Sequence, residues 1–320
     1  METTDHAYEI GGVVARLGVL DERVSFGSVR DILVTESGYY VADGLNPRIV
    51  LLDRQLNVQR IIGRDGQGPG EWASPSRLAG DEGRIVVLDG GAARLQHLTP
   101  SGDFISVAPL PGHARSIDYH SERGLVAATD AFPGHYLARV SGGESTPFAR
   151  IPSAFRGAAS EYLQLPMHET AVSGDGTIHV LDNEHLALVS YADDGQVLGV
   201  RFLPEPARSL RLAHRARTIE SFGGPSRVLG VGLARVESLP DGRLFVSSKL
   251  GPEDPVGHVL DPGDLTAIPV LLSPAYRDAA VRRLSEVHFD GLDRAVLSNS
   301  DAEIMVAEVR LVVLGHDETR

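Results

Sequence analysis

The sequence contains no cysteine, a single lysine (Lys249) and few aromatic residues, which make up 6% of the chain. The absence of cysteine excludes disulfide bridges, thiolate metal ligands and cysteine nucleophiles. Schiff-base chemistry is restricted to Lys249. No Gly-x-Ser-x-Gly motif marks a serine nucleophile, and no predicted helix follows the glycines of Gly63–Gly70, so they do not form a nucleotide-binding turn.

Long apolar runs are also missing, and none approaches the roughly 20 residues that a membrane helix requires. The segment Met1–Arg16 carries Glu2, Asp5 and Glu9 and lacks the basic start of a secretory signal, so we expect a cytoplasmic protein. The net charge is −13, which repels a nucleic-acid backbone. We therefore expect neither a membrane nor a nucleic acid as partner.

The chain is rich in turn residues, with 35 glycines and 19 prolines. One unit recurs six times: an apolar strand, a glycine-containing turn and a second apolar strand. The turn glycines are Gly38, Gly83, Gly124, Gly176, Gly242 and Gly291. Six such units predict an all-β fold, a six-bladed β-propeller that forms a single domain over residues 1–320. A β-sandwich is the structural alternative, but it does not explain a sixfold repeat.

The last repeat is one strand short, because only one long apolar run, Ile304–Leu314, follows its second strand. The N-terminal segment Tyr8–Leu17 precedes the first repeat and contains regularly spaced apolar residues. We expect this segment to close the ring as the outer strand of the last blade, which would protect both end blades from free edges.

Two stretches resemble NHL repeats: GRDGQGPGEWASP at Gly63–Pro75 and VADGLNPRIVLLD at Val41–Asp53. The resemblance is good over the first two repeats, fair over the fourth and weak elsewhere. It implies an NHL-like six-bladed propeller. Such propellers include signalling and RNA-binding modules, and their relatives include lyases and gluconolactonase-like hydrolases, so the fold does not decide the function.

The innermost strands of a propeller line its central channel, and aligning them here predicts a ring of charged residues. The aligned residues are Arg30, Arg77, Arg115, Glu169, Arg235 and Glu286. Four guanidiniums against two carboxylates would give a net positive ring, which suits a substrate carboxylate or phosphate. In the alternative interpretation, these charges only pair with one another around a wet channel.

Two residues further along each strand, the same alignment places Glu237 and His288 among isoleucines and alanines. A carboxylate can orient one imidazole nitrogen while the other nitrogen moves a proton, so this pair is the candidate catalytic site. Glu286, on the same face as His288, is the alternative catalytic carboxylate. Above the ring, His113 and His168 are further candidate substrate contacts.

Several of these histidines and carboxylates are also candidate metal ligands, because some relatives use a divalent ion at the channel mouth. The candidate ligands are His113, His168, Glu169, Glu286 and His288. Four arginines at the same level would oppose a dication, so we expect no metal and no other cofactor.

Three insertions, at Ser153–Pro166, Pro204–Leu229 and Ser273–Leu284, precede predicted innermost strands and should open onto the channel mouth. Ala207–Phe222 has helical spacing, with Leu210, Ala213, Ala216 and Ile219 as its predicted apolar face. We expect a basic helical lid, with an ordinary surface helix as the alternative.

These observations favour a stand-alone enzyme that binds an anionic small molecule at the channel mouth and transfers protons without a redox cofactor. An elimination, an isomerisation or a cyclisation would fit, as in a biosynthetic lyase, isomerase or cyclase. The alternative is a non-catalytic module that recognises a protein or peptide partner.

Overall fold

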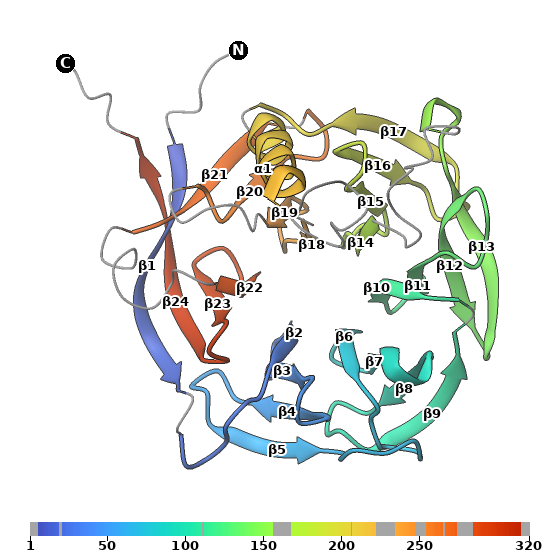
Figure 1. The fold of residues 1–320 in the computed structure, drawn as a ribbon, viewed down its shortest axis with the longest axis vertical. Coiled ribbons are helices and arrows are strands. Elements are labelled where there is room, and N and C mark those ends of the chain that lie inside the picture. Colours follow the sequence, from blue (N-terminus) through green and yellow to red (C-terminus); the bar gives the residue numbers. More distant parts are fainter. Residues whose placement is uncertain are drawn as a thin grey trace.

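The computed structural model describes residues 6–18, 21–110, 112–155, 168–205, 207–221, 234–247, 254–264, 266–273 and 284–314. Most of these residues lie in antiparallel sheets whose strands follow one another along the chain. The sheets stand around a common axis, and the strand that begins each predicted repeat lies innermost (Figure 1). This is the radial arrangement expected of a β-propeller.

Four of the sheets have four strands each. The first contains β2 (Val29–Thr35), β3 (Gly38–Asp43), β4 (Arg48–Leu52) and β5 (Val58–Ile62). The second contains β6 (Pro75–Gly80), β7 (Ile85–Asp89), β8 (Arg94–Leu98) and β9 (Phe104–Pro109). The third contains β10 (Ala114–His120), β11 (Gly124–Thr129), β12 (His135–Ser141) and β13 (Glu144–Arg150). The fourth contains β14 (His168–Val172), β15 (Ile178–Asp182), β16 (Ala187–Tyr191) and β17 (Val197–Phe202).

The remaining strands form one eight-stranded sheet in the order β18-β19-β20-β21-β1-β24-β23-β22. Its first half contains β18 (Val236–Ser238), β19 (Leu244–Ser247), β20 (Gly257–Leu260) and β21 (Ala267–Leu272). Its second half contains β1 (His6–Leu17), β22 (Leu284–Phe289), β23 (Arg294–Asn299) and β24 (Ile304–Val313). Two 3₁₀-helices, Gly90–Ala92 and Ser153–Phe155, lie in connections.

The N-terminal strand β1 joins the two halves of this sheet. It runs antiparallel to β24, from His6 opposite Val313 to Leu17 opposite Ile304, as predicted from the missing strand of the last repeat. It also pairs in parallel with β21, where Tyr8 lies opposite Val270. This second pairing was not predicted, and it merges what the sequence suggested were two separate sheets.

In the first two sheets, an aspartate at the end of the second strand fixes the loop that leads into the innermost strand. The fully buried Asp43 carboxylate accepts hydrogen bonds from the backbone N–H groups of Gly27 and Ser28, at 3.1–3.2 Å. Asp89 makes the same contacts with Ala73 and Ser74 in the next sheet. A buried carboxylate needs such donors, so each of these two repeats positions its own channel-facing strand.

Apolar side chains from adjacent sheet faces make the core. The only tryptophan, Trp72, is fully buried between the first two sheets, and its indole N–H donates to the carbonyl of Ile62 at 3.1 Å. Gly63 has φ of +78°, and a Cβ there would lie 2.1 Å from the indole nitrogen. The first glycine of the loop that resembles an NHL repeat is therefore required for the packing of Trp72.

The predicted helix is present as α1 (Ala207–Ser221), but its buried face is not the predicted one. Ala213 and Ala216 are exposed, whereas Arg211 is buried and donates a hydrogen bond to the carbonyl of Ser247 at the end of β19. Arg211 can be buried because its guanidinium donates to a carbonyl and its aliphatic stem packs as an apolar group. This burial, rather than the spacing of the alanines, decides which face of α1 lies against the ring. Ile219 lies outside the residues whose side chains are described.

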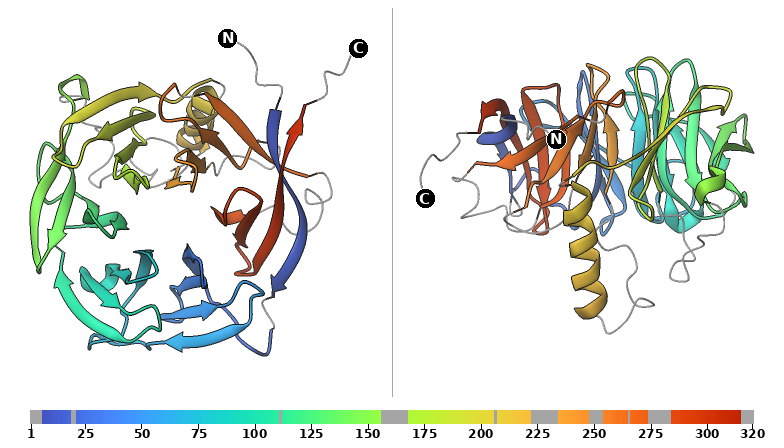
Figure 2. Two further views of the ribbon diagram at one scale, coloured as in Figure 1. Left: turned by 180° about the vertical axis from the view of Figure 1, so that it is seen from behind. Right: turned by 90° about the horizontal axis from the view of Figure 1, so that it is seen from above.

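Helix α1 stands out from one face of the ring and does not lie across it (Figure 2). The structure therefore contradicts the expected arrangement of α1 as a lid over the channel mouth. Residues 156–167, 222–233 and 274–283, which make up most of the predicted insertions, lie outside the described residues. Among the described helices, none has the length and apolar character needed to cross a membrane.

Candidate functional site

The innermost strands enclose a central cavity of about 290 Å³. All six of them, β2, β6, β10, β14, β18 and β22, contribute residues to its wall. The charged residues and the histidine that line it are Asp31, Arg77, Asp118, Glu169, Arg235, Glu237 and His288. A cavity of this volume suits a metabolite-sized ligand.

Four inner strands skip one residue of the pairing near their start, and in β2 and β10 the skipped residue is an arginine of the predicted ring. The pairing of β2 with β3 skips Arg30, so that Val29 lies opposite Asp43 and Asp31 lies opposite Ala42. Arg30 is exposed and Asp31, buried at 4% exposure, takes its place. Because one residue of shift exchanges the two faces of a strand, a carboxylate replaces a guanidinium in the wall.

The same shift occurs in β10, where the pairing skips Arg115 and Ser116 lies opposite Ala128. Ser116 reaches the cavity wall, and Arg115 does not. Arg115 is half-buried, and burial lowers its pKa against the attraction of Glu169. The predicted ring of four arginines and two glutamates is therefore wrong in composition.

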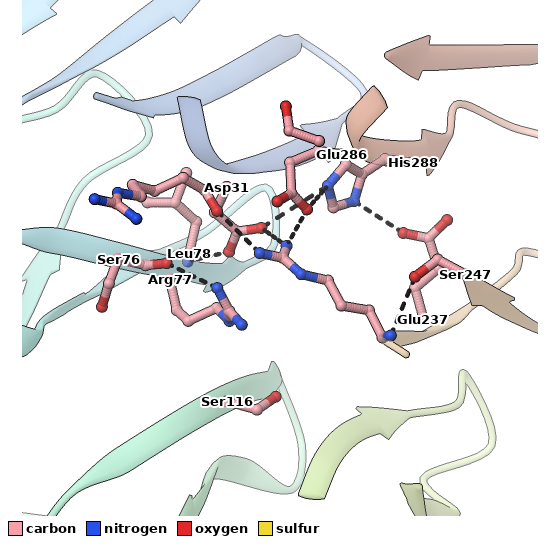
Figure 3. A network of polar contacts seen from close by, with 12 residues as sticks. Asp31, Ser76, Arg77, Leu78, Ser116, Glu237, Ser247, Glu286 and His288 are labelled. Atoms are coloured by element: carbon pink, nitrogen blue, oxygen red, sulfur yellow. Dashed lines mark hydrogen bonds and ion pairs between the residues drawn. The ribbon is translucent and has the colours of Figure 1, made fainter. Parts of the chain in front are cut away.

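The two arginines that do reach the wall are paired with carboxylates. Arg77 Nη2 lies 3.3 Å from Glu169 Oε1. Arg235 Nη1 contacts Asp31 and lies 2.9 Å from Glu286 Oε2 (Figure 3). The net positive ring expected from the sequence is absent, because carboxyl groups outnumber guanidiniums around the described cavity.

Asp31 stays ionised despite its burial. Burial alone would raise the pKa of its carboxyl, but the positive charges of Arg235 and Arg77 outweigh burial and lower it. One of its oxygens also accepts the backbone N–H of Leu78 at 2.8 Å. The effect is reciprocal: burial alone would lower the pKa of Arg235, but the neighbouring carboxylates of Glu286 and Asp31 raise it.

The predicted pair of Glu237 and His288 forms. Glu237 Oε2 lies 3.0 Å from His288 Nδ1, and its other oxygen accepts the backbone N–H of Phe289 at 2.8 Å. Burial opposes the charged imidazole, but the hydrogen bond and negative charge of Glu237 win and raise the pKa of His288. Nδ1 is thus fixed and Nε2 faces Asp31 and Glu286, at 3.8 and 3.9 Å.

Asp118 is a cavity residue that the sequence alignment missed. Its carboxylate accepts backbone N–H bonds from Val172 and Tyr119, at 2.6 and 2.7 Å. Burial, reinforced by the negative charges of Glu237 and Asp31, outweighs these bonds and raises the pKa of Asp118 to about 7. A carboxyl with this pKa can donate or accept a proton at neutral pH.

The two upper histidines do not reach the cavity wall. His113 is exposed, and its Nδ1 lies 3.4 Å from Asp130. His168 packs edge-on against Tyr136, with 4.5 Å between ring centroids, and burial lowers its pKa to about 4. Their predicted substrate contacts are therefore not supported by the geometry of the described residues.

Asp31, Glu286 and His288 offer three ligand atoms within 4.8 Å of one another, so a metal is chemically conceivable here. However, the Arg235 guanidinium contacts both carboxylates of this group. The residues present thus supply their own cation.

The chain matches no protein-family model and no curated protein. Its fold is similar to that of solved β-propeller proteins. A protein of Bacteroides fragilis has a TM-score of 0.61 and 14% identity, covering 96% of each chain. Virginiamycin B lyase of Staphylococcus aureus has a TM-score of 0.57 and 12% identity, covering 95% of this chain and all of the lyase. A gluconolactonase of Xanthomonas campestris has a TM-score of 0.52 and 13% identity, covering 84% and 82%.

At these identities the comparisons establish the fold alone, a β-propeller that also carries lyases and gluconolactonases. The number of blades and the NHL-like character stay predictions.

Proposed function

We propose that this chain is a propeller enzyme that binds a small polar molecule in the central cavity and transfers protons without a redox cofactor. The observation that carries the proposal is the pair of titratable groups on the cavity wall. The pKa of Asp118 is raised to about 7, and that of His288 is raised by Glu237. Groups tuned in this way, held by a rigid scaffold, are typical of acid–base catalysis.

The roles follow from protonation. Glu237 holds Nδ1 of His288, so the proton on Nε2 is the one available to a substrate. The imidazolium is then the general acid, and the ionised form of Asp118 is the general base. Removing a proton at one point of a substrate and delivering one at another is the chemistry of a lyase, an isomerase or a cyclase.

The wall also bears on the charge of the ligand. Arg77 and Arg235 already face carboxylates, and Arg30 is exposed and does not line the cavity. We therefore propose an uncharged or cationic polar ligand, in place of the anion expected from the sequence. We also propose that the eight-stranded sheet represents two blades, which gives six in total.

The non-catalytic alternative predicted an apolar rim around the channel mouth. In the described ranges, the exposed large apolar residues lie mainly on outer strands such as β9 and β17. No observation at the cavity favours the binding-module function.

A thermal-shift screen with neutral, cationic and anionic metabolites tests the proposal, because a ligand of the folded state raises its apparent stability. We expect uncharged or cationic hits whose stabilisation is lost in His288→Gln and kept in His113→Gln, the exposed control. Turnover of a hit, followed by NMR, should fall about 100-fold or more in Asp118→Asn. Hits that both cavity variants bind and turn over normally would overturn the proposed site.

A further inference from the structure

The cluster of Asp31, Glu286 and His288 has the composition of a divalent-cation site. Their ligand atoms lie within 4.8 Å of one another, and the residues are 4%, 5% and 8% exposed. Two carboxylates and one imidazole suit ions such as Mn²⁺. Two buried carboxylates this close also require a compensating cation, since unpaired buried charge is strongly destabilising.

His288 is oriented as a metal-binding histidine would be. Its Nδ1 is held by the Glu237 carboxylate, and a carboxylate on the far ring nitrogen is the usual support of a ligating histidine. Its buried Nε2 has no hydrogen-bond partner within the described part of the chain. That nitrogen faces Asp31 Oδ1 at 3.8 Å and Glu286 Oε2 at 3.9 Å.

Arg235 supplies the missing cation from a different strand. It precedes β18, and its Nη1 contacts the oxygens of Asp31 and Glu286 that belong to the cluster. Its Nη2 donates to the carbonyl of Arg30 at 2.9 Å, and its backbone N–H donates to Ser247 Oγ at 3.1 Å. Arg235 is therefore anchored at its backbone and at its guanidinium, and the positive charge lies between the two carboxylates.

We propose that Arg235 is the resident cation of a metal-type ligand set, in the position that a divalent ion would otherwise take among Asp31, Glu286 and His288. The inference does not depend on the proposed catalysis, because it concerns only which cation these ligands hold. It implies that removing the guanidinium turns the cluster into a divalent-cation site. The native protein then holds its positive charge covalently and is indifferent to chelators.

The test is Mn²⁺ binding by the full chain, measured by electron paramagnetic resonance and titration calorimetry. Arg235→Ala and Arg235→Gln should each bind one Mn²⁺, about tenfold or more tightly than the wild type. Arg235→Lys keeps the charge and should behave as the wild type. Adding Glu286→Gln to either neutral variant should weaken binding again by about tenfold, because a ligand is lost. Affinity should rise with pH, since a proton on His288 competes with the metal.

Circular dichroism shows whether each variant is folded. If Arg235→Ala does not fold, Arg235→Gln, which keeps most of the side-chain length, decides the question. A folded neutral variant without Mn²⁺ binding would overturn the proposal, as would a wild type that binds Mn²⁺ as tightly as the variants. The readout involves no turnover, so it can fail or succeed independently of the proposed enzyme function.

Discussion

Two buried histidines in the ring differ in the groups that hold them. His179, on β15, is 2% exposed, and its two nitrogens lie 3.0 and 2.9 Å from the hydroxyls of Ser190 and Ser173. Burial lowers its pKa to about 4. His288, on β22, is 8% exposed, but a carboxylate holds one nitrogen, the other nitrogen has no hydrogen-bond partner among the described residues, and its pKa is raised.

Similar burial therefore gives pKa shifts of opposite direction, because hydroxyl groups do not offset the desolvation of an imidazolium and a carboxylate does. The volume of the adjacent space does not distinguish the two histidines by function. The groove beside His179 has a volume of about 440 Å³, whereas the central cavity beside His288 has a volume of about 290 Å³. Both ring nitrogens of His179 contact neutral hydroxyls, which identifies it as a structural residue. His288 has a carboxylate partner, a raised pKa and one nitrogen without a hydrogen-bond partner among the described residues, which identifies it as the candidate functional residue.

The largest expected effect is the acid sensitivity caused by His179. Its folded pKa of about 4 lies below the unfolded value, so its contribution to stability is present above pH 6.5 and is lost as the pH falls toward 4. Between pH 7.5 and 4.5 the wild type should lose about 2–3 kcal/mol of unfolding free energy relative to His179→Gln. Urea unfolding at both pH values measures this. A free-energy difference that does not change with pH would contradict the neutral assignment.

An intermediate effect is expected at Asp118, the acidic member of the cavity. Its folded pKa of about 7 lies above the unfolded value of 3.8, so ionisation costs stability as the pH rises from about 4 through 7. Asp118→Asn should gain about 1–2 kcal/mol relative to the wild type between pH 5 and 8, a figure reduced because the group is partly exposed. Urea unfolding checks it, with Asp53→Asn on the ring surface as control. Parallel pH profiles for Asp118→Asn and the wild type would refute the raised pKa.

The smallest effect concerns His288 itself. Its folded pKa lies above 6.5, so the stability it adds is fully present below pH 6.5 and disappears as the pH rises through the folded pKa. In an NMR titration the His288 ring should titrate above pH 6.5, while His179 stays neutral over that range. Glu237→Gln should bring the His288 midpoint down, because it removes the main favourable partner. An unchanged midpoint would mean that Glu237 does not set the charge of His288.

The propeller fold could be predicted because its signals are local and repeated. Turn glycines and strand-ending aspartates recur in the chain, and the strands follow them. The pairing of β1 with β24 followed from counting strands in the last repeat. The parallel contact of β1 with β21 left no local signal, because it depends on how the two halves of one sheet meet.

The site was predicted less well, because the inner strands were aligned with one another rather than with their neighbours. Counting along each hairpin places Asp31 opposite Ala42 and Ser116 opposite Ala128, in each case next to the last residue of the second strand. That count was available in the sequence and would have excluded Arg30 and Arg115 from the wall. Glu237 and His288 line the cavity as predicted, because the alignment of their strands agreed with the hairpin pairing: in β22 it started from Glu286, which follows the skipped Ser285.

The same correction explains why Asp118 was missed. The uncorrected alignment placed Ile117 in the layer of Glu237 and His288, but Ile117 packs in the apolar core of its sheet. Asp118, the next residue, lines the cavity beside Ile117. The raised pKa of Asp118 depends on burial and on carboxylates from distant strands, so only the folded structure reveals it.

The pairing of β1 with β24 also has a consequence for how the chain is made. His6–Leu17 leaves the ribosome long before its partner Ile304–Val313, so during synthesis β1 waits without its antiparallel neighbour. Contacts between such distant parts of a chain form slowly, and an unpaired strand edge invites association with other chains. Completion of the ring is therefore a late step, and the nascent protein is most vulnerable to aggregation just before it.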